Sequence, residues 1–314
     1  MLLIGAFTVN LVLALSACAM PTLVQILGTM KQFQKDWTFP RVTEIGASIN
    51  YTLFDPDVIG RVDITNTFYG NELNTEYLFG AFSSFGTSKT TSLIGVPLNS
   101  TISELVIQGD TVSLSLIAMF NWTVKIVPVQ VNFFFKFDDE GKVTQYDAQL
   151  VHSSWLFQTV LPGFIPILAK ELGLPVTTNP FILVAKRAAM DICAEHDQFC
   201  TGENLQYKST EECMNFIETA IPFGDYWQAG QNSGICRYLH KAMVSRRPSV
   251  HCPHIGPSGG DMCIDRDYEE TVTKNPFKKP FIGMPEGIAI PDSLQPTHPV
   301  SFACQGDCHL KMKV

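Results

Sequence analysis

The first periodic segment of the chain is a stretch in which apolar residues recur at intervals of three and four. Between residues 22 and 36 these are Leu23, Ile26, Leu27, Met30 and Phe33. This spacing puts them on one side of a helix and predicts an amphipathic α-helix over residues 22–36. Residues 61–68 then read as a β-strand that ends at Gly70, and residues 71–85 return to helical spacing.

Three long β-rich segments follow and give the clearest pattern in the chain. They span residues 111–122, 127–137 and 142–152, and the turn residues Asp138-Asp139-Glu140-Gly141 separate the last two. Each exceeds the usual strand length of about 5–6 residues. The segments therefore predict a strongly curved antiparallel sheet.

Strand alternation assigns one face of this sheet to the interior. If Asn121 carries a glycan, its side of the strand 111–122 faces solvent, and the even-numbered residues of that strand face inward. The inner set is then Val112, Leu114, Leu116, Ala118, Phe120 and Trp122, followed by Phe133, Phe135 and Phe137, and by Tyr146, Ala148, Leu150 and His152.

Helical patterns replace the strands after residue 153. The apolar segment 155–171 contains Pro162 and Pro166, which predict helical pieces rather than one helix. Residues 174–180 have the composition of a linker. Three further helices are expected, over residues 181–196, after the capping box of Ser209 and Glu212, and over residues 233–244.

The order helix, strand, helix and three long antiparallel strands resembles the cone-shaped α+β fold of the SnoaL-like and nuclear-transport-factor-like superfamily. The segment FFFKFDDEGKV at residues 133–143 looks like the penultimate hairpin of that superfamily. The resemblance covers residues 43–172 and rests on element order. It implies a fold shared by cyclases, isomerases, dehydratases and plain binding modules, so it selects no single activity. The cysteine-rich half resembles no family that we recognise.

These patterns define an α+β fold: a curved antiparallel sheet and its helices form a cone, followed by a mostly helical, disulfide-linked domain. The expected segments are a signal peptide at 1–19, the cone at 20–175, the cysteine-rich helical domain at 176–275 and an irregular proline-rich tail at 276–314.

The N-terminal segment indicates export. Residues 1–19 contain no charged side chain and end in Ala17-Cys18-Ala19, which has the small-x-small form of a signal-peptide cleavage site. The alternative is an uncleaved membrane anchor, although the segment is short for a span of about 20 residues. No later segment has the length of a membrane span.

Cysteine use agrees with an oxidising compartment. Eight cysteines remain after the leader and all lie in the second half: Cys193, Cys200, Cys213, Cys236, Cys252, Cys263, Cys304 and Cys308. Their even number predicts up to four disulfides, with Cys304 and Cys308 as a local pair. The alternative is a zinc site, but the chain has no C-x-x-C pair.

Three N-glycosylation sequons lie in the first half, at Asn50, Asn99 and Asn121. A glycan on Asn121 would obstruct the outer sheet face, through which proteins of the resembled fold often pair, so we expect a monomer. The formal net charge is −8 and no long basic segment occurs, which excludes nucleic acid as an expected partner.

The inner wall predicted for the cone suits an apolar small molecule. Phe120, Trp122, Phe135 and Tyr146 are the expected ligand-lining residues, and a packed core without a ligand is the alternative reading. His152 is the one ionisable group of this face. With Asp63 and Tyr69 on the opposing strand it is a candidate general base; the alternative is a structural histidine at the edge of the core.

A second candidate site is a group of histidines tethered by cysteines. His240 lies one helical turn after Cys236, and His251 and His254 flank Cys252. The three histidines, with Asp261 or Asp265, are candidate ligands of zinc or copper. The alternative is that they cap backbone groups of a cross-linked loop.

Two functions follow. The first is a secreted glycoprotein that acts as a small-molecule-binding or structural module with an apolar cone interior. The second is an enzyme of the secretory pathway, an isomerase, cyclase or metal-dependent enzyme, acting on an apolar small molecule. The chain has neither a G-x-S-x-G nor an H-E-x-x-H motif.

Overall fold

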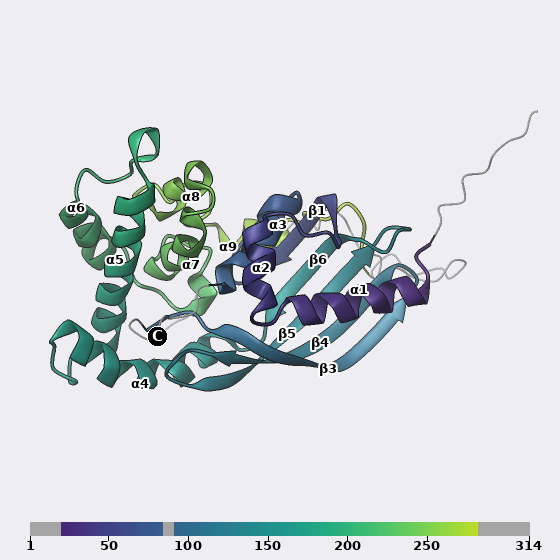
Figure 1. Ribbon diagram of the computed structural model, residues 1–314, viewed down its shortest axis with the longest axis horizontal. Helices are drawn as coiled ribbons and strands as arrows, with labels where there is room; N and C mark the ends of the chain where they lie inside the picture. The colour runs from purple at the N-terminus through teal and green to yellow at the C-terminus, as the bar shows by residue number, and fades with distance from the viewer. Residues whose placement is uncertain (1–19, 84–90, 282–314) are drawn as a thin grey trace, which may run out of the picture.

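The computed structural model describes residues 20–83 and 91–281 of the 314-residue chain (Figure 1). The strands in this part are β1 (Phe54–Val62), β2 (Thr67–Tyr69), β3 (Val96–Gln108), β4 (Thr111–Asn121), β5 (Ile126–Phe137) and β6 (Val143–Leu150). The α-helices are α1 (Leu23–Asp36), α2 (Arg41–Ser48), α3 (Asn71–Leu78), α4 (Ser153–Leu172), α5 (Pro180–Phe199), α6 (Thr210–Asn215), α7 (Gly234–Val244), α8 (Pro248–Ile255) and α9 (Tyr268–Thr273).

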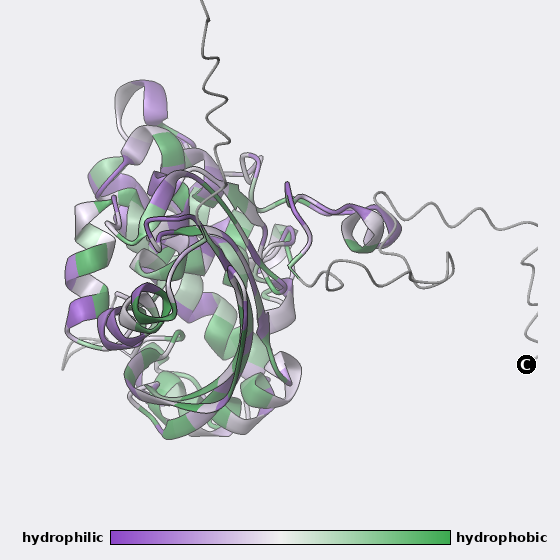
Figure 2. Cartoon of the chain, turned by 90° about the vertical axis from the view of Figure 1, so that its right-hand side faces the viewer, coloured by the Kyte–Doolittle hydropathy of each residue, from purple (hydrophilic) through white to green (hydrophobic). Residues whose placement is uncertain are grey.

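The strands of the described residues form one six-stranded sheet in the order β2-β1-β6-β5-β4-β3. All neighbours are antiparallel except β1 and β6, which run parallel. Figure 2 shows the sheet in profile as a strongly curved band. The predicted α+β class and the cone of the resembled superfamily are confirmed, with one parallel pairing added.

Helix α1 crosses the concave face and closes the cone (Figure 1). Thr22 begins it with a capping box completed by Gln25. The ring of Phe33 lies 5.9 Å from that of Phe133 and 5.3 Å from that of Phe135. The helix therefore buries Ile26, Met30 and Phe33 of its predicted apolar side, whereas Leu23 and Leu27 at its beginning are exposed.

The inner face assigned by strand alternation is confirmed along all three central strands. Pairing places Val112 opposite Phe135, and Phe135 opposite Tyr146. Each of these three side chains is fully buried. His152 is the exception. Strand β6 ends at Leu150, so His152 lies beyond the strand, at the start of α4.

The strand expected over residues 61–68 is wrong in its bounds. The chain forms a hairpin in which β1 ends at Val62 and β2 begins at Thr67. In the turn, the Thr65 amide donates to the Val62 carbonyl and the Val62 amide to the Asn66 carbonyl. Strand β3 was not expected from the sequence.

The break expected in segment 155–171 is also wrong, because α4 is one continuous helix. Pro162 and Pro166 are four residues apart, so both lie on the same, exposed side. On this side water can bind the carbonyl groups that lose their helical partners at proline. The helix expected over residues 71–85 likewise ends earlier, at Leu78.

The second half is helical and disulfide-bonded, as predicted. Three disulfides join Cys193 to Cys213, Cys200 to Cys252 and Cys236 to Cys263. Cys304 and Cys308 lie outside the described residues, as does the leader. Ser209 caps α6 by accepting from the Glu212 amide, which confirms that helix start.

The segment after α9 lies against the outer face of the sheet. Gln145 on β6 accepts from the amides of Lys278 and Lys279, and the ring of Phe281 lies 5.8 Å from that of Phe134. None of the helices within residues 20–83 and 91–281 is long and apolar enough to cross a membrane.

Candidate functional site

Helix α3 brings polar side chains of the first half against the second half. Its Asn74 amide is buried and donates to the carbonyls of Val58, Phe68 and Gly70 at 2.8–3.1 Å. These bonds fix the helix on the β1–β2 hairpin. This anchoring directs Glu76 and Tyr77, which follow after Thr75, toward α8 and α7.

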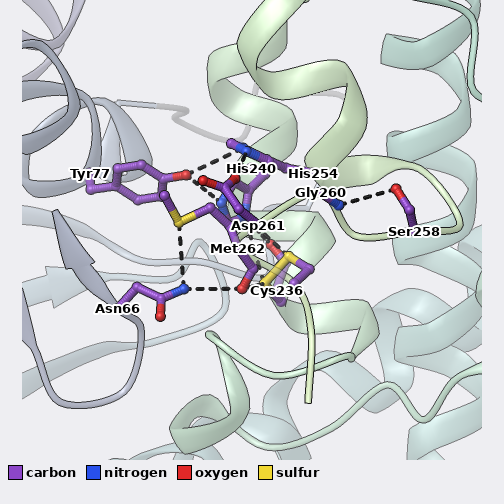
Figure 3. Close-up of polar contacts among 10 residues, drawn as sticks. Asn66, Tyr77, Cys236, His240, His254, Ser258, Gly260, Asp261 and Met262 are labelled. Carbon is purple, nitrogen blue, oxygen red and sulfur yellow. Dashed lines mark hydrogen bonds and ion pairs between the residues drawn. A yellow bond between two sulfur atoms is a disulfide. The ribbon is translucent and has the colours of Figure 1, made fainter. Parts of the chain in front are cut away.

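Tyr77 connects the two halves (Figure 3). Its ring stacks on Phe68 with centroids 4.0 Å apart, and its hydroxyl lies 2.6 Å from Nε2 of His240. Nδ1 of His254 lies 3.4 Å from the same hydroxyl. One phenol oxygen thus faces nitrogen atoms of two histidines.

The other nitrogen of each of these histidines also has a partner. Nδ1 of His240 donates to the Cys236 carbonyl at 2.7 Å, and Nε2 of His254 donates to Asp261 Oδ1 at 2.8 Å. A carbonyl or carboxylate oxygen only accepts, so these contacts assign the tautomers. The nitrogens that face Tyr77 therefore carry lone pairs in the neutral rings.

Glu76 and His251 form the second part of the group. Both are fully buried, and Oε1 of Glu76 lies 3.2 Å from Nε2 of His251. The contact has the distance of an ion pair but lacks hydrogen-bond geometry, since all three of Oε1, Nε2 and Nδ1 remain without hydrogen bonds. Arg247 pairs with Oε2 of Glu76 and with Glu72.

Burial controls the charge of this group. It raises the pKa of Tyr77 well above its usual value and lowers that of His240 well below its usual value. Burial, followed by the nearby His251, lowers the pKa of His254 to about 4. At neutral pH Tyr77, His240 and His254 are therefore uncharged.

The sequence placed His240, His251 and His254 in one site, and the structure brings their rings together. The side-chain atoms of the described residues that are spaced to share a metal ion belong to Cys236, His240 and Cys263. The two sulfur atoms of this set are bonded to each other, so neither is available as a thiolate ligand. Asp261 contacts His254.

An apolar cavity of about 70 Å³ lies on the other side of Tyr77, where the C-terminal half covers the mouth of the cone. Trp37, Phe120 and Trp122 line it from the first half. Tyr226 and Leu239 line it from the second half. The wall of the cavity is therefore formed by both halves, and Tyr77 is part of the contribution from the first half.

Two of the four expected ligand-lining residues, Phe120 and Trp122, line this cavity. Phe135 and Tyr146 are fully buried in the packed part of the cone instead. The cone is accordingly filled at its narrow end by its own rings and hollow at its mouth.

The structure does not bring together His152, Asp63 and Tyr69 as a catalytic group. His152 is exposed, adopts a left-handed conformation at the start of α4 and packs beside Trp155. Asp63 accepts from the Leu150 and Ile64 amides, and burial raises its pKa. Tyr69 is 56% exposed on the edge strand β2.

The sequons differ in surroundings. Asn50 and Asn99 are exposed, whereas Asn121 is half-buried and its side chain accepts from the Thr123 amide. Sequence reasoning missed Glu76 altogether. Tyr77 falls within the helical spacing of residues 71–85, and no local pattern distinguishes it or Glu76 from a surface or core position.

The first half is a cone formed by a curved sheet and its crossing helix. Among solved structures the chain is similar to a steroid delta-isomerase from Pseudomonas aeruginosa (13% identity, TM-score 0.30, 49% of this chain and 99% of that one). An LEH-like epoxide hydrolase from M. tuberculosis is similar at 12% identity and TM-score 0.34, over 47% and 97%. These likenesses carry no functional assignment.

The chain belongs to the BfoA family. The BfoA N-terminal domain matches residues 31–148, and the BfoA family C-terminal domain matches residues 152–266. It is 39% identical over 258 residues to Bifonsecin B biosynthesis cluster protein A of Aspergillus brasiliensis, covering 81% of this chain and 84% of that protein. Aurasperone B biosynthesis cluster protein A of Aspergillus niger is 38% identical, over 81% and 82%.

Proposed function

We propose that the protein binds an apolar, ring-containing small molecule of a biosynthetic pathway at the junction of its two halves. The observation that carries this proposal is the apolar cavity at the mouth of the cone, whose wall both halves share. Relatives named after two biosynthesis clusters support a pathway compound as the ligand.

The size of the cavity determines how a ligand enters. At about 70 Å³ it is smaller than the roughly 150 Å³ that holds benzene in an engineered protein core. A ring-sized ligand therefore requires the wall formed by Ala229, Ile235 and Leu239 to move outward from the sheet. Binding would then replace contacts between the halves by contacts with the ligand.

Tryptophan fluorescence tests this proposal, because Trp37 and Trp122 line the cavity. We expect 1-naphthol, a neutral two-ring probe, to quench their emission saturably. Leu239→Ala should enlarge the cavity and strengthen binding, whereas Ala229→Leu should fill it and weaken binding. Leu105→Ala, at an exposed position on β3, is the matched control. Equal affinity in all four proteins would place the probe elsewhere.

We further propose that the protein is exported and glycosylated. The three disulfides support an oxidising compartment, and Asn50 and Asn99 are exposed where a glycan can be attached. Mass spectrometry of protein from culture medium tests this directly. We expect an N-terminus at Met20 and mass lost on endoglycosidase treatment; protein retained inside the cell without glycans would overturn the proposal.

A second candidate function is catalysis at the same cavity. It is favoured by Tyr77, whose ring lines the cavity and whose hydroxyl is bonded to His240. Proton transfer to or from a bound ring compound, as an isomerase or cyclase requires, would need the Tyr77 hydroxyl to turn toward the cavity. It would also need ligand binding to bring the pKa values of Tyr77 and His240, which burial shifts away from neutrality, back toward the working pH. Metabolite profiles of the producing host should show the same accumulated precursor for gene deletion and for Tyr77→Phe. A wild-type profile for Tyr77→Phe would exclude this role.

A further inference from the structure

The rings of three histidines gather at the junction of the two halves. The ring centroids lie 4.9 Å apart for His240 and His254, 5.3 Å for His251 and His254, and 6.3 Å for His240 and His251. Imidazoles bound to one ion by bonds of about 2.0–2.1 Å have centroids about 5–6 Å apart. The three rings therefore have about the mutual separation of metal-bound imidazoles, although their nitrogen atoms do not yet converge on one point.

The hydrogen bonds of two of these rings match those of metal-binding histidines. Such histidines donate their second nitrogen to a carbonyl or carboxylate oxygen, which orients the first toward the ion. His240 does so to the Cys236 carbonyl, and His254 to Asp261. Both remaining lone pairs face the Tyr77 oxygen, whose single proton satisfies one of them.

Glu76 and His251 supply an independent observation. Both are fully buried, and Oε1 of Glu76 and both ring nitrogens of His251 have no hydrogen bond. Unpaired polar atoms in a protein interior are unfavourable unless a ligand binds them. Arg247 holds Oε2 of the same carboxylate, so Oε1 is the oxygen that remains for an ion.

We propose that His240, His251 and His254, with Glu76 as oxygen donor, bind one zinc or copper ion. Nitrogen with one carboxylate oxygen is a ligand set suited to either metal. Binding of one ion requires the rings to turn until their lone pairs meet at a common point, and the Tyr77 hydroxyl, which contacts both His240 and His254, is then displaced or becomes a further ligand.

Metal analysis of the full-length secreted protein tests this proposal. The protein is stripped with a chelator, incubated separately with Zn²⁺ and Cu²⁺, desalted and analysed by inductively coupled plasma mass spectrometry. We expect about one ion per chain for at least one metal, loss of the ion in His251→Ala, and retention in His152→Gln, whose histidine is exposed outside the group. An ion content near zero for both metals, or an unchanged content in His251→Ala, would overturn the proposal.

A second variant is needed because substitution of the buried His251 could prevent folding. Asp261 is exposed and contacts only the far nitrogen of His254 within the group, so Asp261→Asn should fold normally. Loss of such an orienting carboxylate weakens metal binding about 10- to 100-fold. An unchanged dissociation constant in Asp261→Asn would count against His254 as a ligand. Because 1-naphthol binding is measured on the stripped protein, failure of the metal site is distinguishable from failure of the proposed cavity.

Discussion

The two halves of the protein are stabilised by different means. The cone is held by aromatic rings that pack between helix and sheet, such as Phe33 between Phe133 and Phe135. All six cysteines bridged among the described residues lie in the other half. The long, regular sheet of the first half buries a large apolar face, whereas the helices of the second half are also joined by covalent links.

The comparison extends to where each half keeps its buried polar groups. In the cone these are scattered, such as the Tyr51 hydroxyl, which donates to Asp36 at 3.0 Å, and the Tyr146 hydroxyl, which has no hydrogen bond. At the junction, by contrast, α3 presents Glu76 and Tyr77 to three histidines of the second half. Apolar packing thus shapes the cone, while the polar contacts determine how the second half docks on it.

The largest effect is expected from the disulfides. Cys200→Ala with Cys252→Ala removes a link across 52 residues and should lower the free energy of unfolding by about 4 kcal/mol. Cys193→Ala with Cys213→Ala removes a link across 20 residues and should cost about 3 kcal/mol. Guanidinium unfolding of both variants measures which one loses more free energy of unfolding. The reverse order would show that local strain or packing, not loop length, sets the contribution.

The next effect tests the close packing of the cone. At Gly60 an added Cβ would lie 2.1 Å from both Asn74 Oδ1 and the Tyr146 ring. Gly60→Ala should therefore displace the anchor of α3 and destabilise the protein by about 3 kcal/mol. Gly28 on α1 has no atom within 4 Å of such a Cβ, so Gly28→Ala should stabilise by about 0.5–1 kcal/mol. Thermal unfolding of both variants checks whether Gly60→Ala lowers the unfolding temperature and Gly28→Ala raises it.

The elements that the sequence predicts correctly are those whose signal is local. Val112 to Trp122 alternate strictly between buried and less buried positions, and Ser209 begins its helix by accepting from the Glu212 amide as expected. Strand β3 escaped prediction because it is an edge strand whose residues are mostly exposed, so it lacks the apolar alternation that identifies a strand.

The candidate site was predictable in part for a similar reason. The three histidines lie close together in the sequence, and the disulfide from Cys236 to Cys263 keeps their segments together. Their partners Glu76 and Tyr77 lie more than 160 residues earlier, and no local pattern links the two segments. His152 was assigned to the cone interior because alternation was extended past the end of β6.

A smaller effect is expected at the polar junction. Tyr77→Phe keeps the ring on Phe68 but removes the proton that the hydroxyl donates to His240. It should destabilise the protein by about 1–2 kcal/mol, since a buried nitrogen loses its partner. Tyr69→Phe, at an exposed position, should change stability by less than about 0.5 kcal/mol. Equal changes in urea unfolding would mean that the hydroxyl contributes nothing to docking.

The smallest effect compares one helix cap in each half. Thr22 caps α1 over the cone, and Ser209 caps α6, which the Cys193–Cys213 disulfide links to α5. Thr22→Ala and Ser209→Ala should each cost about 1 kcal/mol, because each leaves one helix N–H without its acceptor. Hydrogen exchange should show faster opening of α1 in the first variant, and of α6 in the second. If Ser209→Ala also opens α1, the two halves unfold as one unit, and the contrast between them concerns only how each is built.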